Sequence, residues 1–153
     1  MDAAPGRALG IDFGERRIGV ALSDDERRLA VPWGIVGRAS DRQAIGELAA
    51  LVREQGVTLL VAGEPRGLDG GAGPAALRAR RFAERLARAA RLPLVVVDEA
   101  LTTSVAARRL AEAGVGRREM AGRLDAVAAQ ILLQEALDRG LADPRTTDRT
   151  ESR

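Results

Sequence analysis

Three carboxylic acids stand at positions in this sequence where a carboxylate could do chemistry. Asp12 lies in the middle of an apolar, β-prone run, Glu99 follows the most apolar run of the chain, and Asp125 opens a run with helical periodicity. Acids gathered at one point repel one another unless divalent cations neutralise them. Two magnesium ions about 4 Å apart could then activate a water molecule and stabilise the leaving oxygen of a phosphodiester. The three acids are therefore candidate metal ligands and candidate catalytic residues.

The strand pattern around Asp12 predicts where its side chain points. Alternation places the three large apolar residues of this run on one face and Asp12 on the other, among small residues. These small neighbours leave room for a bulky group above that face. A buried carboxylate without a partner is costly, so a cation is expected beside Asp12. The alternative is a structural ion pair with Arg16 or Arg17.

The other two acids also have structural alternatives. Glu99 would sit at the carboxyl end of a buried parallel strand, where sites gather, or near the start of the next helix, where its charge favours the dipole. Asp125 has apolar residues three, four and seven positions further on, which places it on the inward face of a helix. Helix N-capping competes with that interpretation, because Asp is a preferred cap. The neighbouring Asp98 is expected to point away from Glu99 and to be structural.

Residue types that are missing from the chain exclude several kinds of chemistry. The 153 residues include no His, Cys, Lys or Tyr, so all 24 basic residues are Arg. Histidine and cysteine metal ligands, Ser-His and Cys-His pairs, Schiff-base lysines and the P-loop lysine are thereby ruled out. Acid-base chemistry is left to carboxylates, hydroxyls or metal-bound water. Because oxygen ligands are hard, the sequence predicts Mg²⁺, or Mn²⁺, as the cofactor.

The arginines offer two candidate contacts for phosphate. Arg16 and Arg17 lie between the first two predicted strands, close to Asp12, and are well placed to bind substrate phosphate. Four further arginines recur three, four and three residues apart along a predicted helix: Arg78, Arg81, Arg85 and Arg88. That stripe could follow a phosphate backbone. The simpler interpretation is a solvated helix surface, in which Glu84 pairs with Arg88.

The predicted elements must bring these residues together. Apolar runs at 8–13, 18–22 and 29–36 with short connections predict an antiparallel meander, and Pro32 favours an edge position or a bulge in the third strand. A capping box at Ser40 begins a helix. Two buried strands follow at 57–62 and 94–97. Helices are expected after Pro74 and at about 103–113 and 123–138. The helix after Pro74 should bury Ala75, Ala79, Phe82, Leu86 and Ala89.

The fold class predicted from this order is α/β, a mixed five-stranded sheet flanked by helices on both faces. The length fits one domain, expected over 1–139, and the polar stretch 140–153 is expected to be disordered. No apolar run approaches the roughly 20 residues that span a bilayer, and the N-terminus has no signal pattern. A cytoplasmic location without membrane contact is expected.

Several motifs in order and spacing make the chain resemble the YqgF family, also called RuvX, over roughly residues 7–139. The motifs are Gly10-Ile11-Asp12-Phe13-Gly14, Arg17-Ile18-Gly19-Val20-Ala21, Asp69-Gly70, Val97-Asp98-Glu99, Leu101-Thr102-Thr103 and Asp125-Ala126-Val127-Ala128-Ala129. The resemblance implies an RNase H-like nuclease domain that matures the 5′ end of 16S ribosomal RNA during ribosome biogenesis. The family's site acids match Asp12, Glu99 and Asp125.

Two departures from the family pattern bear on the site. Ala100 stands where an arginine usually follows the Asp-Glu pair, so Arg108, Arg16 or Arg17 would have to supply the missing charge. A glycine-rich loop that usually opens Gly-Leu-Pro here reads Gly63-Glu64-Pro65. Both changes leave the fold untouched and concern activity and substrate choice.

The function predicted is a metal-dependent nuclease acting on precursor 16S ribosomal RNA, in contact with ribosomal particles and as a monomer or homodimer. The first alternative is a resolvase of four-way (Holliday) DNA junctions, which needs a dimer with two sites. The second is a non-catalytic nucleic-acid-binding module, which the missing arginine favours. An actin-like phosphotransferase shares the first-strand motif, but the chain is too short for a two-lobed nucleotide site.

Overall fold

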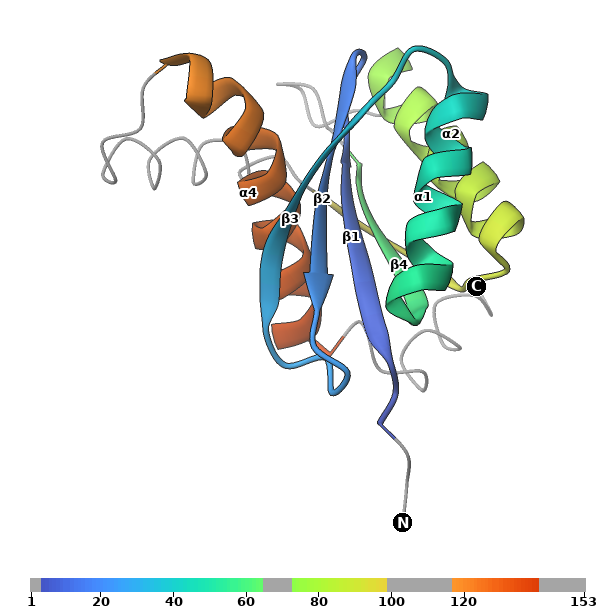
Figure 1. The fold of residues 1–153 in the computed structure, drawn as a ribbon, viewed down its shortest axis with the longest axis vertical. Coiled ribbons are helices and arrows are strands. Elements are labelled where there is room, and N and C mark those ends of the chain that lie inside the picture. Colours follow the sequence, from blue (N-terminus) through green and yellow to red (C-terminus); the bar gives the residue numbers. More distant parts are fainter. Residues whose placement is uncertain (1–3, 65–72, 99–116, 141–153) are drawn as a thin grey trace.

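The computed structural model describes residues 4–64, 73–98 and 117–140, without the side chains of 117–123. Five strands form one mixed sheet in the order β3-β2-β1-β4-β5 (Figure 1). The antiparallel pairs are β1 with β2 and β2 with β3, whereas β4 runs parallel to β1 and β5 parallel to β4. The predicted meander joined to parallel strands is confirmed. The strands are β1 (Arg7–Phe13), β2 (Arg17–Ser23), β3 (Ala30–Gly37), β4 (Val57–Glu64) and β5 (Leu94–Asp98).

Helices cover both faces of this sheet, as predicted. Figure 1 shows α1 (Asp41–Gln55) and α2 (Pro74–Ala90) side by side on one face, and α4 (Arg117–Asp138) on the other. Helix α4 begins six residues before the predicted start at 123. The prediction missed these residues because the first turns of the helix are polar and carry no apolar periodicity. The predicted helix at 103–113 and the predicted tail after 140 lie outside the described residues.

The two helices on the first face begin where the sequence predicts. The hydroxyl of Ser40, the N-cap of α1, accepts the Gln43 N–H at 3.1 Å. The Gln43 side chain accepts the N–H of Ala39 at 2.9 Å, one residue earlier than in a standard capping box. Pro74 occupies the first turn of α2, where its missing N–H costs nothing.

Strand alternation divides the apolar residues between two cores. The core under α1 and α2 includes Leu9 and Ile11 of β1, whereas the core under α4 includes Ala8 of the same strand. Asp12 therefore lies on the α4 face, as its parity predicts. The expected buried face of α2 is partly wrong: Ala75 and Ala89 are exposed, because the helix is rotated so that Ala76, Ala83 and Ala87 are buried instead.

Helix α4 packs against the sheet at two glycines. A Cβ added to Gly10 would lie 2.8 Å from the Leu133 Cβ, and one added to Gly19 would lie 1.9 Å from the Asp125 carbonyl oxygen. Both distances are shorter than real Cβ contacts allow. The absence of side chains at these two positions therefore sets how closely α4 approaches β1 and β2.

The turn between β2 and β3 lies at the other end of the sheet from the connection between β1 and β2, and it is held by hydrogen bonds to Asp24. The Asp24 carboxylate accepts the N–H groups of Arg28 and Leu29 at 2.7 and 3.0 Å. These two hydrogen bonds, that of Leu29 first, hold the pKa of Asp24 below its usual value. Strand β3 is an edge strand, as Pro32 predicts. None of the helices that the structure describes is both long and apolar enough to cross a bilayer.

Candidate functional site

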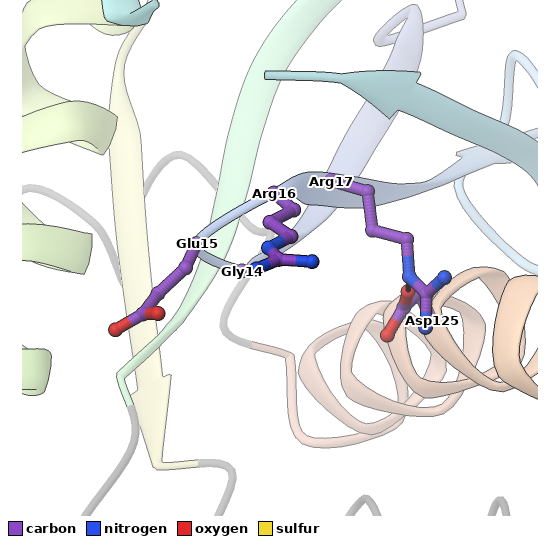
Figure 2. A pocket seen from close by; sticks show the side chains of 5 residues that line it. All are labelled: Gly14, Glu15, Arg16, Arg17 and Asp125. Atoms are coloured by element: carbon purple, nitrogen blue, oxygen red, sulfur yellow. Dashed lines mark hydrogen bonds and ion pairs between the residues drawn. The ribbon is translucent and has the colours of Figure 1, made fainter. Parts of the chain in front are cut away.

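An open pocket of about 420 Å³ lies where β1 passes into β2. It is lined by Gly14, Glu15, Arg16 and Arg17, here called the β1–β2 loop, together with Asp125 of α4 (Figure 2). Strands β1, β4 and β5 run parallel, so their carboxyl ends lie at this same end of the sheet. Functional groups of mixed and parallel sheets usually gather at that edge.

Asp125 reaches the pocket from the middle of α4. The helix starts at Arg117, more than two turns earlier, so the alternative that Asp125 is an N-cap is wrong. Its side chain is one-quarter exposed and forms an ion pair with the Arg17 guanidinium. Figure 2 shows the two side chains pointing toward each other across the gap between strand and helix. The carboxylate is thus held at the pocket by a residue from the first half of the chain.

Asp12 approaches the same place from the central strand. It is half-buried on the α4 face of β1, and its partner in the β1–β2 register is Gly19. Gly19 is the residue against which the Asp125 backbone packs. Opposite residues of an antiparallel pair have Cα atoms about 5 Å apart. Gly19 therefore brings the backbones of two of the predicted site acids to one point of the sheet.

The third acid and one predicted arginine lie beyond what the structure describes. Glu99 and Arg108 fall in the 99–116 stretch, although Glu99 directly follows β5, the neighbour of β4. Within the described part of the chain, no group of three acids forms a metal site. The oxygen donors that are described, Asp12 and Asp125, favour a hard divalent cation over zinc or copper.

The β1–β2 loop is held in place by Arg38, which follows β3. The Arg38 N–H donates to the Arg16 carbonyl oxygen at 2.8 Å, and its guanidinium donates to the Glu15 carbonyl oxygen. The same guanidinium donates to Asp41 at 2.8 Å and lies over the Phe13 ring, 4.9 Å from its centroid. This arrangement fixes the loop while Arg16 and Arg17 remain exposed. Exposed guanidinium groups on an ordered loop can bind phosphate.

Substituting Arg38 by Met should weaken substrate binding more than turnover. Methionine keeps an apolar stem on Phe13 and removes the side-chain hydrogen bond to Glu15, so the loop must be ordered when substrate binds. A free-energy cost of about 1.4 kcal/mol for ordering the loop on binding raises KM about tenfold. The measurement is KM and kcat for an RNA substrate, with Arg42→Met as a control that removes an equal, exposed charge from α1. An equal rise in KM for both variants would contradict a positioning role.

Two residues of this site escaped the sequence-based prediction. Arg38 carries no local signal, because its partners become neighbours only through folding. Gly19 does carry a local sequence signal, since an isolated glycine within a strand pattern indicates a bulge or a close backbone approach. In the sequence, Gly19 belongs to an apolar run and to the Arg17–Ala21 motif, and neither pattern indicates that this glycine sets the position of Asp125.

Comparison with known proteins extends this description. The family model RuvX, described as Holliday junction resolvase, matches residues 6–139. A protein of Acidiphilium cryptum named "putative pre-16S rRNA nuclease" is 43% identical over 91% of this chain and 87% of its own length. A protein of the same name from Anaeromyxobacter sp. is 45% identical over 86% of this chain and 96% of its own.

Solved structures support the fold. Thermus thermophilus RuvC in complex with a Holliday junction substrate is similar with a TM-score of 0.52, covering 89% of this chain and 96% of its own. The sequence identity is 14%, so this likeness concerns the fold, which is RNase H-like as predicted.

Proposed function

Because the chain belongs to the RuvX family, we propose that it is a metal-dependent nuclease that hydrolyses phosphodiester bonds in precursor 16S ribosomal RNA. Its place in the cell would be the cytoplasm, on ribosomal particles whose 16S RNA is being processed at the 5′ end. The observation that carries the proposal is the approach of Asp12 and Asp125 at Gly19, beside a pocket lined by arginines. Relatives at 43% and 45% identity bear the corresponding name.

Asp12, Glu99 and Asp125 are the proposed ligands of Mg²⁺ or Mn²⁺. When bound, such ions supply an activated water and stabilise the charge that develops on the leaving oxygen. Asp12 is carried by the central strand and Asp125 by a helix packed directly on the neighbouring strand. Rigid elements therefore hold both carboxylates, which is what precise ligand placement requires.

The arginines of the β1–β2 loop would bind the substrate. Arg16 and Arg17 are exposed at the pocket and can donate paired hydrogen bonds to a phosphate. Arg17 also pairs with Asp125, so it orients that carboxylate and reduces the repulsion between the site acids. Arg108 is proposed as a third phosphate contact in place of the arginine that Ala100 replaces.

A second candidate substrate is a four-way DNA junction. The description of the matching family favours it, and a RuvC with the same fold is known on such a junction. Cutting a junction symmetrically needs two sites, so this candidate requires a homodimer, whereas RNA processing is open to a monomer.

Cleavage of two end-labelled substrates tests the proposal. Precursor 16S RNA and a synthetic four-way junction are incubated with the protein and magnesium, manganese or EDTA, and the oligomeric state is measured in the same buffers. Metal-dependent cleavage of the RNA with the junction left intact is the expected result. Junction cleavage by a dimer would favour the second candidate. Binding without cleavage by well-folded protein would overturn the enzyme proposal and leave a binding module.

A further inference from the structure

Helix α2 carries a row of arginines on the side away from the core. Arg78, Arg81, Arg85 and Arg88 are all exposed, and their spacing places them within one narrow arc of the helix. The residues that α2 buries lie on its opposite side. We call these four residues the arginine face.

Ion pairs place the arginine face next to the candidate site. The Arg78 guanidinium lies 3.5 Å from the Glu15 carboxylate of the β1–β2 loop. The Arg85 guanidinium lies 3.2 Å from Asp41, the acid that also accepts a hydrogen bond from Arg38. Glu15 belongs to the β1–β2 loop, and Arg38 joins Asp41 to this loop through hydrogen bonds to both residues. The arginine face therefore begins at the pocket and continues away from it along α2.

The dimensions and chemistry of this face fit a phosphate backbone. From Arg78 to Arg88 the helix rises about 15 Å. Consecutive phosphates wind around a duplex, so a row of this length can reach a few consecutive phosphates of one strand. No aromatic side chain accompanies the arginines: Phe82 is buried, Phe13 lies under Arg38, and Trp33 belongs to the far edge strand. Single-strand binding usually needs stacking aromatics, so this face suits a duplex.

We propose that the arginine face binds the phosphate backbone of a double-stranded segment of the substrate as it leaves the pocket past the β1–β2 loop. This inference rests on the proposed nuclease function. Cleavage would then be directed to a point next to a helix of RNA, because the duplex held on α2 sets which phosphodiester enters the pocket. Contacts to the backbone position the substrate and carry no base preference.

Binding measured over a range of salt concentrations tests this. The variant is Arg81→Gln/Arg88→Gln, which leaves Arg78 and Arg85 and their ion pairs with Glu15 and Asp41 intact. Its matched control is Arg28→Gln/Arg53→Gln, which removes two exposed charges, one between β2 and β3 and one in the last turn of α1. The probes are a short RNA duplex and a single strand of the same sequence. Losing two phosphate contacts should reduce the slope of log K against log salt by about 1.8 on the duplex.

Each outcome decides one point. A smaller slope on the duplex, with an unchanged slope on the single strand, a control like wild type and kcat retained at saturating substrate, supports the inference. An unchanged slope in a protein whose wild type binds and cleaves RNA overturns the inference and leaves the proposed function standing. Equal losses on both probes overturn the assignment to a duplex. Wild type that neither binds nor cleaves RNA overturns the proposed function and the inference together.

Discussion

Asp12→Asn is expected to lower the rate of phosphodiester cleavage by about a thousandfold or more, which corresponds to about 4 kcal/mol of lost transition-state stabilisation. The amide keeps the size of the side chain and removes the negative charge that a divalent cation requires. Since Asp12 is only half-buried, near the carboxyl end of the central strand, an isosteric change should leave the fold intact. Binding of the RNA should persist, because the arginines are untouched.

The measurement is single-turnover cleavage of precursor 16S RNA at several magnesium and manganese concentrations, together with thermal unfolding of each protein. Asp25→Asn is the matched control, because Asp25 is an exposed acid in the turn at the opposite end of the sheet. Asp125→Asn should resemble Asp12→Asn if both acids hold the same ions. Cleavage by Asp12→Asn at the wild-type rate would remove this residue from the proposed metal site.

Gly19→Ala is expected to destabilise the fold and to lower activity at the same time. The new Cβ would lie 1.9 Å from the Asp125 carbonyl oxygen, so α4 has to move away from β2. Overpacking of a tight interface costs about 1–3 kcal/mol, and the backbone contact at Gly19 argues for the upper end of that range. Because Asp125 moves with its helix, a displacement of about 1 Å should reduce cleavage about a hundredfold.

Chemical denaturation and single-turnover cleavage measure the two effects. Gly37→Ala is the control, since Gly37 is also a strand glycine and a Cβ there meets no atom within 4 Å. That control should change the free energy of unfolding by about 0.5 kcal/mol or less. A Gly19→Ala protein as stable and active as wild type would show that the position of α4 on β2 is not critical.

Much of the fold could be predicted because it is encoded in short-range patterns. The two-residue alternation around Asp12 assigned this acid to the correct face of the sheet, and the N-cap Ser40 and the first-turn Pro74 marked two helix starts. The absence of His, Cys and Lys restricts acid-base chemistry to carboxylates, hydroxyls or metal-bound water. These signals arise from residues that are close in the sequence, so local periodicity is sufficient to predict the elements.

Contacts between distant residues were decided only by the tertiary structure. The local sequence around Asp125 favoured a helix cap over an inward site residue, and the outcome depended on where α4 begins and on Arg17, 108 positions away. The partners of Arg38 and the location of the arginine face likewise depend on how the loops at one end of the sheet meet. Sequence alone determined which side chains could do chemistry. Their grouping required the packing of α4 on Gly19, because the closeness of two backbones leaves little trace in local sequence patterns.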